Sequence, residues 1–375
     1  MKLVNYIVLG LLLISNNCLA VTFQKNDIKL DVNGYVGYKY INATNDDKTI
    51  QSEPELGLML SLQINDYLST YTQFEYDEDI NNALVYSFAS FDYPINEELV
   101  IGLKAGKLRH SYALYNDVRV NPRTRPGIIA PQAIYWNSLG SLLTSGVGVN
   151  FNIKWKNLEL SYSIVDPSIT DKKQEAATWT RGLVTEVDTS FGDYRLATLK
   201  YTHDTVPITF KSTWARINLG NKTSAASNFI FPNDKDQDQK LNIFVNSLEY
   251  TWRDLTVSAE SIMVKTFFNK WNSPGQWSDG YSFGLRYEAT ENISLYTNYN
   301  YYHSQQLKNL PPSPYTTIHT GDINFGANYH KDNWMIGVEA HKIQGGRWAL
   351  PENYNADRGA YENWWIIATN FAYFF

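Results

Sequence analysis

The chain has 375 residues, of which 43% are hydrophobic and 15% aromatic, and its formal net charge is -6. This apolar content, with only 19% charged residues, excludes a disordered chain, and the acidic balance offers no surface for nucleic acid. The mean hydropathy of -0.36 argues against a bundle of membrane-spanning helices, because the apolar residues must be dispersed along the chain.

Residues 1–20 predict a secretory signal peptide. Lys2 supplies a positive charge, residues 7–14 form a short apolar run, and residues 18–20 include small side chains suited to cleavage. The apolar run is too short to anchor the chain in a bilayer. A lipidated Cys18 is the alternative, which the two asparagines before it disfavour. Cleavage would remove the only cysteine, so residues 21–375 would fold without a disulfide.

Sixteen segments of the remaining chain alternate apolar and polar residues with the period of two that is typical of β-strands. In one of them Tyr281, Phe283, Leu285 and Tyr287 alternate with Ser282, Gly284, Arg286 and Glu288. One face of such a strand could lie in lipid while the other meets water. The predicted strands cover residues 28–41, 55–65, 69–77, 83–94, 99–108, 143–155, 158–166, 193–203, 207–218, 241–252, 255–267, 279–290, 293–304, 318–330, 334–345 and 363–375.

The connections between these segments alternate between short and long. Those after even-numbered segments are short, as at 65–66, 156–157 and 253–254, whereas those after odd-numbered segments are mostly long. This asymmetry is typical of an outer-membrane barrel with both termini in the periplasm; a soluble sandwich shares the alternation but not the asymmetry. We therefore predict an all-β fold, a transmembrane antiparallel β-barrel of about 16 strands. Fourteen or eighteen strands stay open, because residues 167–192 could hide a strand pair.

The C-terminal segment carries a second pattern. Phe371, Tyr373 and Phe375 fall on one face of the last predicted strand, and the chain ends on an aromatic residue. Such an end resembles the assembly signal that the bacterial barrel-assembly machinery reads. An ordinary edge strand is the alternative, which the signal peptide at the other end disfavours. The same rings would anchor a barrel at the membrane interface.

Residues 21–375 resemble, over their whole length, the Gram-negative outer-membrane porins of the general or solute-selective kind. The resemblance rests on the signal peptide, the sixteen strands, the aromatic C-terminus and a long third loop, and barrels of this width leave an aqueous lumen. It implies a homotrimer in the bacterial outer membrane that passes small hydrophilic solutes and ions. It also implies a third loop folded into the lumen and contacts with membrane lipids and lipopolysaccharide. Acidic residues 46–47 and 77–79 of predicted outer loops could reach lipid phosphates through divalent cations.

The third long connection, residues 109–142, is the candidate constriction. Its charged residues are Arg109, Asp117, Arg119, Arg123 and Arg125. The loop is thus basic within an acidic chain, and prolines and aromatic residues restrict its backbone. In a narrow channel such a guanidinium cluster concentrates anions and repels cations, and arginine holds a carboxylate or phosphate through paired donors. We therefore expect an anion-preferring pore.

Other charged residues are expected on the lumen wall by their parity along the strands. They are Lys104 beside the constriction, and Glu260, Arg286, Glu288 and Glu339 farther round the barrel. If the loop arginines pair with such acids, the loop exerts no net field, and this alternative stays open. The familiar porin constriction sets an acidic loop against a basic wall. The basic loop departs from that pattern, which puts a cation preference in doubt.

No cofactor or metal is expected. Asp234, Asp236 and Asp238 alternate as in a calcium loop, but Gln239 and Val245 stand where that loop needs glycine and glutamate. The six histidines show no zinc spacing, and no glycine-rich phosphate loop or nucleotide fingerprint occurs in the sequence.

The sequence thus favours a passive diffusion pore without catalytic turnover. The first alternative is an outer-membrane hydrolase, a lipase or protease on a narrower barrel. His303 and Ser304 could begin a nucleophilic pair, but neighbours in a strand point to opposite faces. The second is an adhesion barrel that acts through aromatic outer loops, which contain Trp348, Tyr354 and Tyr361. Strand number discriminates, because a narrow barrel with a packed lumen favours the enzyme and sixteen strands favour the pore.

Overall fold

The computed structural model describes ten stretches of the chain. They are residues 21–43, 50–76, 84–118, 121–135, 145–167, 187–223, 236–268, 276–304, 318–344 and 363–375. Several predicted features lie outside these described residues: the signal peptide, the acidic residues 46–47 and 77–79, Arg119, Asp234, and the aromatic residues Trp348, Tyr354 and Tyr361.

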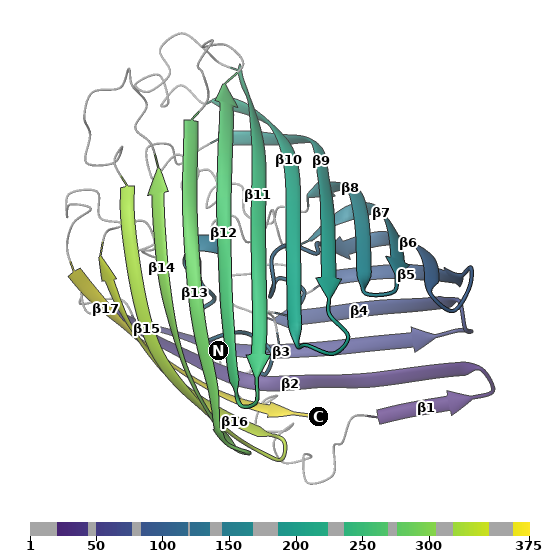
Figure 1. Cartoon of the computed structure of the whole chain (residues 1–375), viewed down its shortest axis with the longest axis horizontal. Coiled ribbons are helices and arrows are strands. Elements are labelled where there is room, and N and C mark those ends of the chain that lie inside the picture. Colours follow the sequence, from purple (N-terminus) through teal and green to yellow (C-terminus); the bar gives the residue numbers. More distant parts are fainter. Residues whose placement is uncertain are drawn as a thin grey trace.

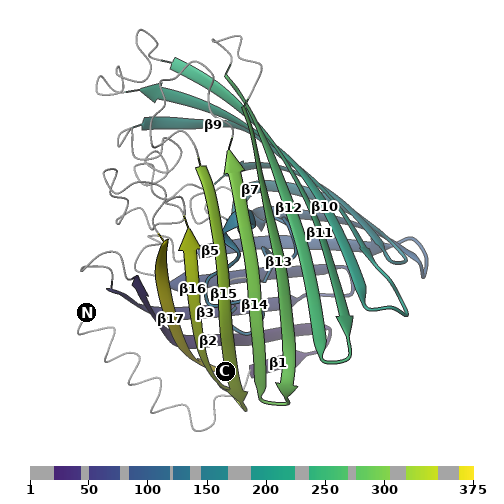
Figure 2. The ribbon, with the colours of Figure 1, turned by 60° about the vertical axis from the view of Figure 1, so that its left-hand side comes forward.

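Sixteen antiparallel strands, β2 to β17, close into a barrel (Figure 1). Each strand pairs with the next along the chain, and β17 returns to pair with β2 from Ile366↔Ala43 to Phe374↔Tyr35. Figure 2 shows these two strands side by side. The strands are β2 (Ile28–Ala43), β3 (Ile50–Gln63), β4 (Leu68–Tyr76), β5 (Leu84–Pro94), β6 (Leu99–Arg109), β7 (Ser145–Trp155), β8 (Leu158–Pro167), β9 (Val187–Thr202), β10 (Ile208–Thr223), β11 (Asp236–Trp252), β12 (Leu255–Phe268), β13 (Gln276–Thr290), β14 (Ile293–Ser304), β15 (Ile318–Lys331), β16 (Trp334–Gln344) and β17 (Asn363–Phe374). The predicted barrel is confirmed, with sixteen strands rather than fourteen or eighteen.

One strand was not predicted. β1 (Val21–Lys25) forms a hairpin with the start of β2, with pairs from Val21↔Val32 to Lys25↔Ile28, and Asn26 turns the chain at a φ of 55°. This part of β2 extends past Tyr35, the last residue of β2 that pairs with β17. β1 therefore covers backbone groups that the closing strand does not reach, which removes an open edge.

Tight turns join the strands at one end of the barrel. Lys156, Arg253 and Asp332 adopt φ values of 49°, 53° and 52° in the two-residue connections after β7, β11 and β15. A positive φ at such a position suits the twist of a hairpin. Because successive strands are antiparallel, the long connections lie at the opposite end, so the predicted asymmetry between the two ends is confirmed.

The outward face of the barrel is apolar and exposed. On β7 the side chains of Val147, Phe151, Ile153 and Trp155 are 56%, 54%, 44% and 54% exposed. The inward residues between them are polar or glycine, as the alternation predicts. A barrel that presents such a face needs an apolar environment around it.

The inner face is not uniformly polar, which corrects the expectation that it meets only water. Inward positions on β9 to β11 carry buried apolar side chains: Leu196, Ile217, Leu241, Ile243 and Val245. They belong to one hydrophobic cluster with Tyr112, Ile134 and Tyr135, which come from the connection after β6. Alternation within a strand cannot reveal that a distant segment covers its inner face.

Within the described residues, no helix is long and apolar enough to cross a bilayer.

Replacing Phe325 of β15 by lysine tests whether the outward face lies in lipid. Phe325 is 61% exposed and lies in the middle of its strand, so a charge there should lower the free energy of unfolding by about 2–4 kcal/mol. Tyr329→Lys, near the short turn, is the matched control and should cost about 0–1 kcal/mol. Denaturant titration of the protein folded into lipid vesicles measures both. Equal costs would contradict the membrane placement.

Candidate pore constriction

The connection after β6 turns into the barrel and fills part of the lumen. Its described residues, 110–118 and 121–135, are called the lumen loop here, and they include one turn of helix, α2 (Gln132–Tyr135). Tyr112, Ala113 and Asn116 are at most 1% exposed. α2 packs against β12, β13 and β14. The predicted inward fold of the third loop is therefore confirmed.

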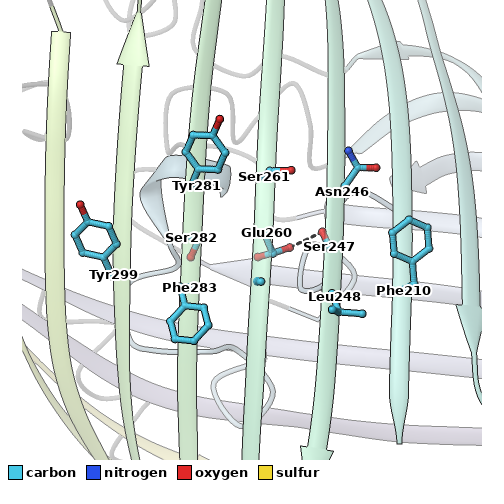
Figure 3. Close-up of a pocket in the computed structure, with 11 residues that line it drawn as sticks. Phe210, Asn246, Ser247, Leu248, Glu260, Ser261, Tyr281, Ser282, Phe283 and Tyr299 are labelled. Carbon is cyan, nitrogen blue, oxygen red and sulfur yellow. Dashed lines mark hydrogen bonds between the residues drawn. The ribbon is translucent and has the colours of Figure 1, made fainter. Parts of the chain in front are cut away.

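Glu260 of β12 is the first of three wall carboxylates that hold the lumen loop. It is 4% exposed, and its Oε1 accepts hydrogen bonds from Leu114 N at 2.9 Å and Tyr135 Oη at 2.8 Å. Ser247 Oγ of β11 donates to the same oxygen at 2.9 Å (Figure 3). A carboxyl group is buried without large cost only when donors surround it in this way. Two of the three donors belong to the loop, so Glu260 fastens the loop to the wall.

Glu339 of β16 is the second anchor. Its Oε2 accepts hydrogen bonds from Ile128 N of the lumen loop at 2.6 Å and from Tyr296 Oη at 2.7 Å. On its other side Glu339 contacts His341, whose Nδ1 lies 3.0 Å from Asp322 Oδ1. This chain of buried polar groups fixes the carboxylate that holds the loop.

Glu55 of β3 is the third anchor, and its partner is a predicted loop arginine. Arg125 Nη1 and Nη2 lie 3.3 and 3.2 Å from the two oxygens of Glu55, and Lys39 Nζ lies 3.7 Å from the same carboxylate. Burial lowers the pKa of Arg125, but the charge of Glu55 more than offsets this, so the pKa is raised. Arg125 is thus paired with a wall acid. The sequence had left this arrangement open as the alternative to a free charge in the channel.

The start of the lumen loop is held by Arg109 and Lys211 of the wall and by its own Asp117. Arg109 Nε donates to the carbonyl oxygen of Asn116 at 2.7 Å, and its guanidinium lies 5.7 Å from the ring centroid of Tyr86. Lys211 of β10 donates from Nζ to Asp117 at 3.0 Å. These contacts neutralise Asp117, the one acid of the predicted loop, and orient Arg109 toward the wall formed by β5.

The predicted arginines do not gather into one cluster. Arg123 lies at the short-turn end of the barrel, where Nη2 donates to the carbonyl oxygen of Asp332 at 2.6 Å and the guanidinium lies 4.1 Å from the ring centroid of Phe374. Arg109 and Arg125 contact β5 and β3 instead, and Arg119 lies outside the described residues. Spacing in the sequence could not give this separation, because it depends on the path of the loop across the lumen.

Two other predicted wall residues lie on the inner face of β13. Arg286 Nε and Glu288 Oε1 are 2.6 Å apart, with side chains 34% and 40% exposed. Lys104 of β6 also points inward, 5.7 Å from the ring centroid of Phe88. Among the described residues Lys104 forms no ion pair, so its charge is not cancelled by a direct partner.

Of the predicted assembly-signal residues, Phe371 and Tyr373 lie in β17 and Phe375 follows directly after it. Phe371 is 39% exposed on the outer face, whereas Tyr373 is only 8% exposed because the ring of Trp334 lies 4.5 Å from it. The backbone of Phe375 bonds with Gly34, accepting at 2.8 Å and donating at 3.0 Å. The aromatic C-terminus is therefore built into the seam where the barrel closes.

Sequence reasoning missed Glu55, Tyr296 and His341. A signal for Glu55 was present, because leucines at positions 56, 58, 60 and 62 put the odd-numbered residues of that strand on the inner face. Tyr296 gave no such signal, since inward tyrosines do not differ in sequence from interfacial ones.

The described residues offer no metal centre, since no group of three or more His, Cys, Asp or Glu has suitable geometry there. Asp236 and Asp238, considered for calcium, lie at the start of β11. In the strand register they stand opposite Lys222 and Gly220 of β10. His303, considered as part of a nucleophilic pair, lies 3.4 Å from Asp279 on the neighbouring strand.

The hollow drawn in Figure 3 lies on the outward face, away from the lumen. It has a volume of about 390 Å³. Its apolar lining consists of Phe210, Leu248, Tyr281, Phe283 and Tyr299, which occupy outward positions of β10, β11, β13 and β14. It is therefore a groove toward lipid and does not belong to the path of a solute.

No protein-family model matches the sequence, and neither does any curated protein. Solved structures of outer-membrane barrels do match the fold. OmpT of Vibrio cholerae has a TM-score of 0.64 at 12% identity, over 95% of this chain and all of the other. Salmonella typhi OmpF, solved with daunomycin, has a TM-score of 0.63 at 13% identity, over 95% of this chain and all of the other. The anion-selective porin from Comamonas acidovorans has 0.60 at 11%, over 93% of this chain and all of the other. The chain therefore has a porin-like fold.

Glu260→Ala should release the lumen loop from the wall. Leu114 N and Tyr135 Oη would lose their shared acceptor, and each buried donor left without one costs about 1–3 kcal/mol. We expect faster tryptic cleavage at the loop arginines and a lower denaturation temperature. Glu288→Ala, a half-exposed carboxylate of the same wall, is the control and should leave the cleavage rate near that of the wild type. Unchanged protease resistance in Glu260→Ala would refute the anchoring role.

The free energy of unfolding should decrease as the pH is lowered, because His110 is buried in its neutral form. This side chain is 1% exposed, and neither ring nitrogen has a hydrogen-bond partner in the described part of the chain. Burial lowers the pKa of His110 from 6.5 to about 4, although Asp117 opposes the shift. The neutral ring is favoured in the fold, so its contribution is complete above pH 6.5 and is lost as the pH falls toward 4.

The corresponding test compares wild type with His110→Phe by denaturant unfolding at pH 7 and pH 4. The variant should lose less free energy of unfolding over this interval, by up to roughly 3 kcal/mol. Carboxylates titrate in both proteins, so only the difference between the two is diagnostic. Identical pH dependence would show that His110 is not held neutral.

Proposed function

We propose that the protein is an outer-membrane porin, a water-filled channel for the passive diffusion of small hydrophilic solutes and ions. The observation that carries this is the lumen loop, which is held inside a closed sixteen-stranded barrel by Glu55, Glu260 and Glu339. A barrel of this width has an interior too large for wall side chains alone to fill. A loop fixed across it narrows the opening without moving parts, which suits a passive filter.

The strand number weighs against the alternative of a hydrolase. A lipase or protease was expected on a narrower barrel, whereas the barrel has sixteen strands. The adhesion alternative depends on outer loops that lie outside the described residues, and no contact among the described residues favours it.

The proposed anion preference rests on two of the residues first expected at the constriction. Arg125 is paired with Glu55, and Arg123 lies at the end of the barrel. We therefore assign the preference to Arg109 and Lys104, because neither has a carboxylate partner among the described ion pairs. Cations on a narrowed, partly desolvated wall raise the local concentration of anions. The matched porin of Comamonas acidovorans is described as anion-selective.

The proposed location is the bacterial outer membrane, reached with a cleaved signal peptide and the assembly signal Phe371, Tyr373 and Phe375. Its outward apolar face would contact membrane lipids, and its outer loops lipopolysaccharide. A homotrimer is the proposed assembly, and OmpT of Vibrio cholerae is known in a trimer form. No cofactor is proposed.

Planar-bilayer recording of the purified protein under a salt gradient tests the function. We expect stable conductance in potassium chloride, with a reversal potential that favours the anion. Lys104→Gln and Arg109→Gln should shift the reversal potential toward the cation, whereas Lys156→Gln in a short turn should not. A cation-favouring potential that is unchanged in both lumen variants would overturn the anion preference and leave the pore intact. Complete absence of conductance would overturn the pore itself.

A further inference from the structure

An aromatic surface lines the lumen on the wall opposite the anchors of α2. Glu55 faces inward to meet Arg125, so Ser61 of the same strand also faces inward, and Ser61 pairs with Tyr71 of β4. Tyr71 pairs in turn with Phe88 of β5. Both rings therefore point into the barrel, where the alternation of a porin wall calls for polar side chains.

These rings form a continuous group with Tyr86. The ring centroids of Tyr71 and Phe88 are 5.3 Å apart, and those of Tyr86 and Phe88 are 5.7 Å apart. Tyr71 keeps 37% of its surface exposed. Other inward tyrosines have a structural use, because Tyr135 and Tyr296 donate to the anchoring carboxylates. The exposed ring of Tyr71 has no comparable role in holding the loop.

Two cations border the aromatic group. Lys104 Nζ lies 5.7 Å from the centroid of Phe88, and the Arg109 guanidinium lies 5.7 Å from the centroid of Tyr86. Arg109 donates from Nε to the Asn116 carbonyl oxygen, and its Nη2 is buried and has no hydrogen-bond partner among the described residues. The two charges thus lie beside the rings and are not neutralised by carboxylates bonded to them.

Glycines occupy the inward positions beside Phe88. Phe88 pairs with Gly106 of β6, and Gly106 pairs with Gly148 of β7, so two neighbouring inward positions carry no side chain. Gly106 has a φ of 133°, and a Cβ there would lie 2.4 Å from the carbonyl oxygen of Ser87. The backbone conformation therefore requires glycine.

We propose that Tyr71, Tyr86, Phe88, Lys104 and Arg109 form a binding site for small aromatic carboxylates on the solute path. The inference rests on the proposed pore function and names the solute class that the pore favours. A planar apolar ring packs against Phe88 and Tyr71, and its carboxylate lies toward Lys104 and Arg109. A simple anion gains only the charge contact, and an uncharged ring gains only the packing. The site therefore distinguishes solutes that carry both groups.

The test measures how benzoate and acetate reduce the potassium chloride current of the full protein in planar bilayers. Benzoate should half-block the current at a concentration several-fold lower than acetate does. Phe88→Leu and Tyr71→Leu should raise the half-blocking concentration of benzoate by about three- to tenfold and leave that of acetate unchanged. Lys104→Gln should raise both values. Phe151→Leu, an outward aromatic residue, is the matched control and should change neither.

Folding of every variant is checked by its heat-modifiable migration in detergent gels, and the three lumen substitutions report independently of one another. Equal half-blocking concentrations for benzoate and acetate in the wild type would overturn the inference while the chloride current shows an intact pore. A benzoate effect that survives both leucine substitutions would place the site elsewhere and overturn it as well. Absence of any chloride current would instead overturn the proposed function, and this inference with it.

Discussion

The fold depends on one constraint: a chain that presents an apolar outer face to hydrocarbon must satisfy every backbone hydrogen bond internally. The pairing of β17 with β2 meets it, and β1 covers the part of β2 that β17 does not reach. The even number of strands in the closed barrel follows from this closure, because β17 and β2 pair antiparallel. The aromatic C-terminus lies at the seam itself, where Phe375 bonds to Gly34.

A closed barrel of this width creates a second demand, because its interior has to be filled or left to water. The lumen loop answers it in two ways. Its apolar side chains pack against the inner face of β9 to β14, and its backbone and Arg125 bond to buried carboxylates on three separate strands. The charge of Arg125 is neutralised by its ion pair with Glu55. The proposed anion preference therefore depends on Lys104 and Arg109, which have no carboxylate partner among the described ion pairs.

Much of the fold could be predicted from the sequence, because period-two alternation and turn length are local properties. All sixteen closing strands were predicted, and β14 had the predicted bounds, 293–304. β1 was missed because its five residues follow directly after the predicted signal peptide. The inward direction of Glu260 and Glu339 followed from parity. Their partners Leu114 and Ile128 did not, since these contacts join residues more than a hundred positions apart. For the same reason the sequence identified the arginines of the loop but could not show that each contacts a different part of the barrel.

The central claim is that the polar face of the barrel surrounds a water-filled path and the apolar face does not. Two neighbouring residues of β7 test it most directly, because Asn150 faces inward and Phe151, 54% exposed, faces outward. Single cysteines at each position are exposed to a charged, membrane-impermeant thiol reagent during bilayer recording. The account predicts rapid modification and a reduced current at position 150, and neither effect at position 151. Modification at 151 with none at 150 would contradict it.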